Sequence, residues 1–204
     1  NELWSASLLI SDPEAIVTAH RAYLAAGAEC IATASYQASR EGYEKQGLTS
    51  DEADSLMRLS VQLAKRACGE AQSGAAVAAS LGPFGAMRHD GSEYSGNYGV
   101  TSNVIRDFHE SRLHLFDNDA DVDVIALETI PSLQEAEVLA DLLEGCQTPS
   151  WVSFSCRDEQ HISDGTPLSQ AAKLFASHPR VVAVGINCTA PQFAPALIRS
   201  LCPA

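Results

Sequence analysis

The chain has no long apolar run and no sign of a secretory leader. No apolar stretch approaches the roughly 18 residues that a membrane-spanning helix requires, so the sequence predicts no transmembrane segment and no membrane association. The N-terminus lacks a basic region followed by an apolar stretch, which argues against a signal peptide. It also lacks an initiator methionine, and we expect the chain to be a piece of a longer one.

Positive charge is scarce. The 13 lysines and arginines stand against 26 aspartates and glutamates, which gives a formal net charge of −13 at pH 7. Such a surface repels phosphate backbones, so nucleic acid is not an expected partner. The six cysteines are scattered without a CxxC pair, a pattern typical of reduced thiols. We therefore expect a cytoplasmic location, while nothing in the sequence points to a particular oligomeric state.

Helix and strand patterns alternate along the whole chain. Five short apolar runs begin near residues 30, 75, 122, 151 and 181, and each is followed by a helical pattern. The last three begin 29 and 30 residues apart, close to the roughly 31 residues per unit of a (β/α)₈ barrel. A doubly wound open sheet has similar spacing, but its GxGxxG phosphate fingerprint is absent.

The fold class expected from this pattern is α/β, and the architecture is a partial (β/α)₈ TIM barrel. Because five strands cannot close a barrel of eight, they correspond to strands 2–6 with their helices. We expect one barrel domain over residues 1–204, incomplete at both ends, with parallel strands in sequential order. Between strands, Ser132 and Glu135 predict a capping box, and residues 85–99 predict a polar, glycine-rich loop.

Polar residues follow two apolar strands at the end where barrels bind their ligands. The run 181–186, expected to be covered on both faces, leads into Asn187 and Cys188, and the run 122–127 ends on Glu128. A cysteine here either caps a core strand or, as a thiolate, binds a soft metal or attacks an electrophile. Glu128 either meets a ligand cation, a metal or a fixed donor, or caps a helix. Asn187 either binds a substrate amino acid or satisfies loop backbone.

Familiar catalytic patterns are missing from the sequence. The histidines form no HxxxH or HExxH array, so a metal site built from histidine is not indicated. A Gly-x-Ser-x-Gly elbow is also absent, which argues against a serine hydrolase of the α/β type. No side chain is therefore assigned as a catalytic residue.

Seven segments, taken together and in order, resemble the homocysteine S-methyltransferase family. They are Leu3-Trp4-Ser5-Ala6, Thr33-Ala34-Ser35-Tyr36-Gln37-Ala38, Ser80-Leu81-Gly82-Pro83-Phe84-Gly85-Ala86, Asp90-Gly91-Ser92-Glu93-Tyr94, Glu128-Thr129-Ile130-Pro131, Ser163-Asp164-Gly165-Thr166-Pro167-Leu168 and Gly185-Ile186-Asn187-Cys188. They cover essentially the whole chain. The two loops at 82–85 and 90–94 look most like the branch that uses S-methylmethionine or S-adenosylmethionine as methyl donor.

The resemblance implies a barrel that holds zinc through three cysteines. Cys188 matches the first, in a Gly-Ile-Asn-Cys motif, whereas the adjacent pair of a Gly-Gly-Cys-Cys motif has no counterpart in this chain. The resemblance also implies that Glu128 binds the homocysteine ammonium group and that Asn187 orients the same amino acid. Zinc lowers the pKa of the homocysteine thiol, whose sulfur takes the methyl group of a sulfonium donor to give methionine. No organic cofactor is implied.

Two other hypotheses stay open at this point. The chain as it stands is either a truncated, non-catalytic fragment of that fold or an unrelated barrel enzyme with Glu128 as general base and Cys188 incidental. On the family hypothesis, we expect Glu128, Asn187 and Cys188 to share one rim of the sheet, within reach of one small cavity. We also expect this chain alone to bind Zn²⁺ weakly or not at all, because one thiolate cannot complete a tetrahedral site.

Overall fold

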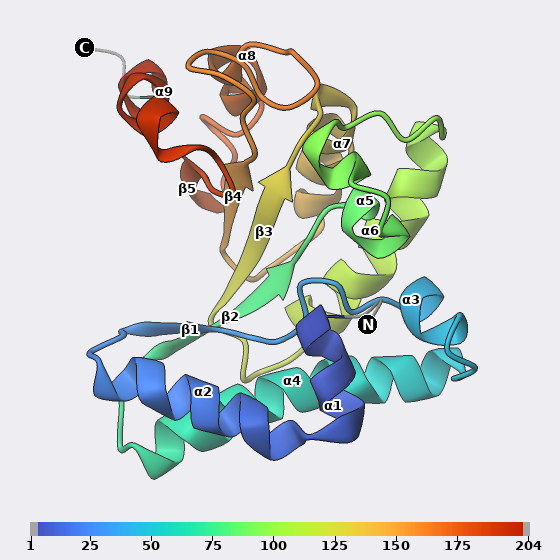
Figure 1. Cartoon of the computed structure of the whole chain (residues 1–204), viewed down its shortest axis with the longest axis vertical. Coiled ribbons are helices and arrows are strands. Elements are labelled where there is room, and N and C mark those ends of the chain that lie inside the picture. Colours follow the sequence, from blue (N-terminus) through green and yellow to red (C-terminus); the bar gives the residue numbers. More distant parts are fainter. Residues whose placement is uncertain (1–3, 202–204) are drawn as a thin grey trace.

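A five-stranded parallel sheet forms the centre of the computed structural model, which describes residues 4–201. The strands are β1 (Cys30–Ala32), β2 (Ala76–Leu81), β3 (Val124–Ile130), β4 (Ser150–Phe154) and β5 (Val181–Ile186). Their order in the sheet is β1-β2-β3-β4-β5, and every neighbouring pair is parallel. The α/β class, the strand order and the strand direction are therefore as predicted, and the open, twisted sheet fits a partial barrel (Figure 1).

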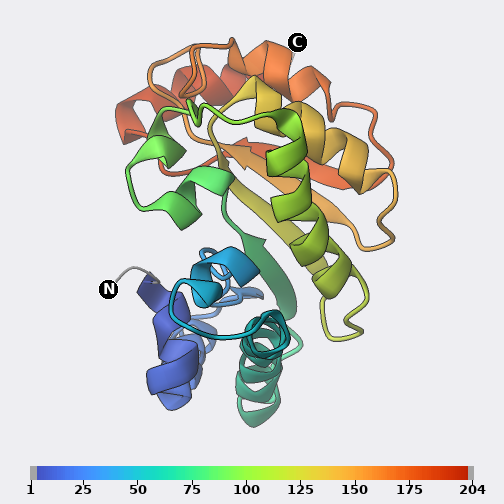
Figure 2. The ribbon, with the colours of Figure 1, turned by 90° about the vertical axis from the view of Figure 1, so that its right-hand side faces the viewer.

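Helices connect each strand to the next and cover the outer side of the sheet (Figures 1 and 2). The longer helices are α2 (Pro13–Ala25), α4 (Ser50–Glu70), α6 (Ser102–Asp117), α7 (Leu133–Leu143), α8 (Leu168–Lys173) and α9 (Ala194–Leu201). Short helices are η1 (Trp4–Ser7), α1 (Leu8–Ser11), α3 (Arg40–Glu44), α5 (Phe84–Arg88), η2 (Ser92–Tyr94) and η3 (Pro191–Phe193). Helices α2 and α4 pack together along one end of the sheet, and α6 packs on α7 near its middle. None of the helices in residues 4–201 is long and apolar enough to cross a membrane.

The strand interiors explain why the central part of the sheet is stable. Val77, Ile125, Leu127, Val152 and Phe154 are all fully buried, as expected for strands of a parallel sheet. Burying each of these side chains contributes on the order of 1.5–3 kcal/mol relative to leaving it exposed.

Strand β5 differs from the expectation that it is covered on both faces. Its residues are half-buried or exposed, and Val182 is 66% exposed. The reason is its place at the edge of the described sheet, where it pairs with β4 alone among residues 4–201. The apolar character of the run predicted the strand correctly, but apolar sequence alone does not show which strand lies at an edge.

The segment 85–99 is more ordered than a polar loop. It contains α5 and η2, and its apolar side chains Met87 and Tyr98 join Phe84 and Phe108 in a small second core. The rings of Phe84 and Phe108 meet edge to face, with centroids 5.3 Å apart. Aromatic packing against α6 therefore fixes this segment close to the carboxyl ends of β2 and β3.

Candidate functional site

The carboxyl ends of the central strands lie level with one another. Ile130 at the end of β3 pairs with Phe154 at the end of β4, and Phe154 pairs with Ile186 at the end of β5. Glu128 lies near the end of β3, and Asn187 and Cys188 follow β5 directly. The structure thus places the three candidate residues on one rim, although β4 separates the strands from which they come.

Thr129 connects the two parts of this rim. Its backbone N–H donates to Asn187 Oδ1 at 2.9 Å, and Asn187 Nδ2 donates to Thr129 Oγ1 at 2.8 Å. The Thr129 hydroxyl in turn donates to Cys188 Sγ at 3.6 Å. The Asn187 side chain thus bonds both the backbone and the hydroxyl of Thr129, and its contact with a substrate amino acid stays a prediction. The residue that brings β3 and β5 together was not singled out from the sequence.

The backbone is unusual at both ends of this contact. Thr129 has φ of +65° and Cys188 has φ of +47°, the left-handed region that non-glycine residues, and β-branched ones above all, seldom adopt. The pairing of β3 with β4 also shifts register between Leu127 and Ile130. Backbone conformations of this kind cost on the order of 1–3 kcal/mol each and concentrate at functional sites. Strain at Thr129 and Cys188 therefore marks this rim as the candidate site.

The Cys188 thiol is exposed, with hydrogen-bond donors on one side of it. Thr129 Oγ1 is one of these donors, and the side-chain nitrogen Nδ2 of Asn187, 3.7 Å from the sulfur, is the other. Donors that face a sulfur favour its role as an acceptor and as a thiolate ligand or nucleophile. The interpretation of Cys188 as an apolar cap buried under the sheet does not fit this exposure.

Glu128 is half-buried and has a hydroxyl as its neighbour. The Ser80 Oγ donates to Glu128 Oε2 at 2.7 Å, from the end of the adjacent strand β2. Burial raises the pKa of Glu128 above its ordinary value, and the hydrogen bond from Ser80 opposes this. A carboxylate in this position gains from a cationic ligand, because such a ligand offsets the cost of its desolvation.

Tyr36 reaches the same place from the segment after β1. Burial raises the pKa of Tyr36, and the nearby Thr129 side chain opposes this rise. The charges of Cys188 and Glu93 raise this pKa further, so these groups lie within electrostatic reach of the phenol. Tyr36 and Glu93 stand in segments that carry the family resemblance, but their residue types alone gave them no role.

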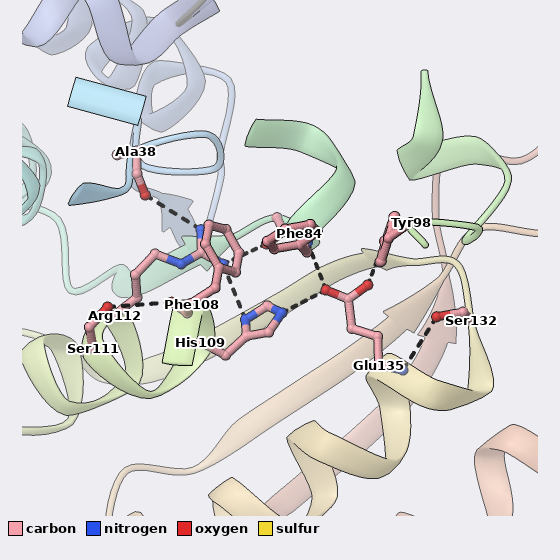
Figure 3. A network of polar contacts seen from close by, with 10 residues as sticks. Ala38, Phe84, Tyr98, Phe108, His109, Ser111, Arg112, Ser132 and Glu135 are labelled. Atoms are coloured by element: carbon pink, nitrogen blue, oxygen red, sulfur yellow. Dashed lines mark hydrogen bonds and ion pairs between the residues drawn. The ribbon is translucent and has the colours of Figure 1, made fainter. Parts of the chain in front are cut away.

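A buried polar network holds the surrounding segments in place (Figure 3). The Glu135 carboxylate, on α7, accepts hydrogen bonds from the Phe84 backbone N–H at 2.7 Å and from the Tyr98 hydroxyl at 2.6 Å. On α6, Arg112 donates to the carbonyl oxygens of Gly82 at 2.6 Å and Ala38 at 3.4 Å. Two helices thereby fix the segments that follow β1 and β2.

The capping box predicted from Ser132 and Glu135 forms only in part. Ser132 Oγ accepts from the Glu135 backbone N–H at 3.3 Å, as in the predicted capping box of α7. The reciprocal bond requires the Glu135 side chain, whose oxygens are used by Phe84, Tyr98 and His109. Tertiary contacts have therefore replaced the local one.

The described residues do not assemble a complete metal site. Within residues 4–201, no group of three or more His, Cys, Asp or Glu side chains is arranged to hold a metal ion. Of the other cysteines, Cys68, Cys146 and Cys156 are buried and Cys30 is exposed on β1, while Cys202 lies outside the described residues. Cys188 is thus a single candidate ligand.

Comparison with known proteins places the chain in a family. The sequence model for homocysteine S-methyltransferase matches residues 1–204. The chain is 44% identical to homocysteine S-methyltransferase YbgG of Bacillus subtilis over 98% of its length, and 44% identical to homocysteine S-methyltransferase 4 of Zea mays over the same share. It covers 67% and 62% of these two relatives, so it spans about two thirds of their length.

A solved structure agrees with the sequence matches. The metallated form of the homocysteine methyltransferase MmuM from Escherichia coli superposes with a TM-score of 0.91 at 41% identity. The match covers 98% of this chain and 72% of that one. With a family match along its whole length and relatives above 40% identity, this chain belongs to the homocysteine S-methyltransferase family.

Proposed function

We propose that the protein transfers a methyl group from a sulfonium donor, S-methylmethionine or S-adenosylmethionine, to the thiol of homocysteine, forming methionine. The observation that carries the proposal is the contact between Thr129, Asn187 and Cys188. In this contact the Cys188 thiol accepts hydrogen bonds on the same rim that carries the half-buried Glu128. The names of the relatives support the transfer of a methyl group to homocysteine.

Glu128 is proposed to bind the homocysteine ammonium group. Burial raises its pKa, so the site favours either a proton or a cationic ligand on this carboxylate. An ammonium group satisfies the second condition at neutral pH. Asn187 orients the amino acid indirectly, because its amide fixes Thr129 and thereby the end of β3.

Methyl transfer makes one demand on geometry. The homocysteine sulfur forms a bond to the methyl carbon as the bond between that carbon and the sulfonium sulfur breaks. The homocysteine thiol releases its proton to water, and the donor leaves as a neutral thioether. Holding two reactants in line in this way lowers the barrier by converting a bimolecular encounter into an intramolecular step. Anchoring the amino acid end of homocysteine at Glu128 contributes to that alignment.

Zinc is the proposed cofactor, with Cys188 as one ligand. Protein thiolates are suited to zinc, and a catalytic zinc site uses three protein ligands and leaves the fourth position for substrate. Residues 4–201 do not fit a complete site of this kind, since they supply one suitably exposed thiol on this rim. The remaining ligands have to come from beyond the described residues.

A methionine-formation assay with two variants tests the proposal in a protein that carries this chain at the length of its relatives. Glu128→Gln is expected to raise KM for homocysteine roughly 10- to 100-fold, the equivalent of a charged hydrogen bond of about 1.5–3 kcal/mol, with KM for the donor little changed. Cys188→Ala is expected to abolish activity, whereas Cys30→Ala on β1 serves as the matched control and retains it. Full activity of Cys188→Ala would show that the assignment is wrong, and absence of methionine from the wild type would favour a non-catalytic role.

A further inference from the structure

Ser80 lies on β2, between β1 and β3, near the rim of the candidate site (Figure 1). It pairs in register with Ala126 of β3, and Glu128 follows Ala126 by two residues. Because side chains alternate along a strand, Ser80 and Glu128 share one face of the sheet. The neighbours Ala79 and Leu81 belong to the main hydrophobic core instead. Ser80, only 3% exposed, is therefore directed to the face that Glu128 occupies.

A closed ring of hydrogen bonds holds the main chain of Ser80. Its N–H donates to Thr33 Oγ1 at 3.0 Å, and its carbonyl oxygen accepts from Ser35 Oγ at 2.8 Å. The hydroxyl oxygens of Thr33 and Ser35 lie 2.6 Å apart. Because the Ser35 proton is donated to a carbonyl, the proton between the two hydroxyls comes from Thr33. Every direction in the ring is thus determined, and each of its three residues is at most 4% exposed.

The ring begins where β1 stops pairing with β2. Strand β1 ends at Ala32, which pairs with Ala78, and the Thr33 N–H still donates to the Ala78 carbonyl oxygen at 2.9 Å. The chain then turns, and the hydroxyls of Thr33 and Ser35 satisfy the main-chain groups of Ser80 that a longer strand would pair. A main chain bonded on both its N–H and its carbonyl leaves the Ser80 side chain a fixed origin.

From this origin the Ser80 hydroxyl donates its one proton to Glu128 Oε2 at 2.7 Å. Within residues 4–201, it is the only hydrogen-bond donor to this carboxylate. The bond occupies one carboxylate oxygen and restricts rotation of the group, which leaves Oε1 for a ligand. An ammonium group has N–H donors only, so it can bond Oε1 while Ser80 remains on Oε2.

We infer that Ser80 is a positioning residue for substrate binding, which holds the Glu128 carboxylate in the orientation that receives the amino group of homocysteine. The inference rests on the proposed function and deepens it, because it requires Glu128 to bind that ammonium group. Ser80 acts through Glu128 and does not itself contact the substrate. The hydroxyls of Thr33 and Ser35 support it by fixing its main chain.

Two ligands that differ only in the amino group test this role. Binding of homocysteine and of 4-mercaptobutanoate, which lacks the amino group, is measured by calorimetry in a protein that carries this chain at the length of its relatives. Ser80→Ala is expected to weaken homocysteine binding roughly 3- to 12-fold and to leave 4-mercaptobutanoate within about 2-fold of the wild type. In a Glu128→Gln background, Ser80→Ala is expected to change homocysteine binding by less than about 2-fold, because the charge it positions is gone.

Ser150→Ala is the matched control. It also removes a buried serine hydroxyl from a strand, at the start of β4, and Ser150 Oγ has no hydrogen-bond partner among the described residues. This variant is expected to change neither affinity. If Ser80→Ala folds poorly, Ser35→Ala opens the ring but keeps the Ser80 hydroxyl, and it is expected to weaken homocysteine binding about 3-fold with 4-mercaptobutanoate unaffected.

The outcomes separate this inference from the proposed function. Unchanged homocysteine binding in Ser80→Ala, beside a clear loss in Glu128→Gln, would overturn the inference alone. Equal weakening of both ligands would show a purely structural role for Ser80, and full additivity in the double variant would show that it does not act through Glu128. No loss in either single variant would overturn the role of Glu128 together with the inference. A loss confined to homocysteine in a protein that forms no methionine would support the inference and contradict the proposed function.

Discussion

His109 shows how a single side chain joins two opposite charges in the interior. Arg112 Nη2 lies 3.2 Å from His109 Nδ1, and His109 Nε2 lies 2.6 Å from Glu135 Oε1. A guanidinium group can only donate, so Nδ1 accepts and Nε2 carries the proton. The imidazole is therefore neutral and links an arginine on its own helix, α6, to a glutamate on α7 (Figure 3). Burial lowers the pKa of Arg112 to about 10, which still leaves it protonated at neutral pH.

This arrangement makes stability depend on pH in a defined direction. Burial lowers the pKa of His109 below the ordinary value of 6.5, Glu135 opposes the shift and Arg112 adds to it. The unfolded chain therefore binds a proton that the folded chain does not, and stability is lost as pH falls below about 6.5. His20 is also buried with a lowered pKa and contributes in the same direction.

His109→Gln is expected to isolate this contribution. Glutamine retains one donor and one acceptor but does not titrate, so the variant loses about 1 kcal/mol of stability at pH 7.5 and shows a shallower fall toward pH 5.5. Urea unfolding at a series of pH values measures both quantities. The same pH dependence in wild type and variant would contradict the assignment of a neutral, buried imidazole.

At the scale of elements, the position of η2 is set by close packing against α5. Gly85 has no side chain, and a Cβ there would lie 2.4 Å from the Glu93 nitrogen and 2.8 Å from both its Cα and the Ser92 carbonyl carbon. These contacts are with backbone, which cannot move aside as a flexible side chain does. Glycine is thus required at this position by the approach of two segments and not by a turn.

Substitution of two glycines by alanine is expected to change stability in opposite directions. Gly85→Ala destabilises the protein by about 1–3 kcal/mol, because η2 has to shift away from α5. At Gly69, in the last turn of α4, a Cβ would meet no atom of another described segment within 4 Å, so Gly69→Ala stabilises by up to roughly 0.5–1 kcal/mol. Chemical unfolding of both variants gives the comparison, and a stable Gly85→Ala would show that η2 is free to move.

At the scale of the whole molecule, the described sheet is an open arc. Strands β1 and β5 lie at its two edges and do not pair with each other within residues 4–201. The single candidate ligand, Cys188, follows the edge strand β5. On the proposed zinc role, Cys188 would therefore supply its ligand from this edge of the described sheet.

Metal binding tests this conclusion directly. The 204-residue chain is expected to bind Zn²⁺ weakly or not at all, because one thiolate cannot replace three ligands. A protein at the length of the relatives is expected to bind one ion tightly and to lose it on Cys188→Ala. Metal analysis after dialysis, with and without a competing chelator, measures both. Stoichiometric, tight zinc in the 204-residue chain would contradict the expectation.

The sequence by itself determined the class of the fold. Alternation of apolar runs with helical patterns predicted β1–β5, their order and their parallel direction, because the burial of strand faces and helix stripes follows from residue spacing. It also indicated the rim, since Glu128, Asn187 and Cys188 directly follow or end apolar runs. These are local properties, which depend on residues near one another in the chain.

Contacts between distant residues were decided by the tertiary structure alone. Thr129 meets Asn187 and Cys188 across 58 and 59 positions, and Ser155 lies beside Glu93 across 62. The tertiary structure also decided that β5 lies at an exposed edge. It likewise decided that the Glu135 carboxylate bonds Phe84, Tyr98 and His109 instead of completing the capping box. Such contacts depend on how twisted strands and covering helices bring loops together, and no periodicity in the sequence encodes that arrangement.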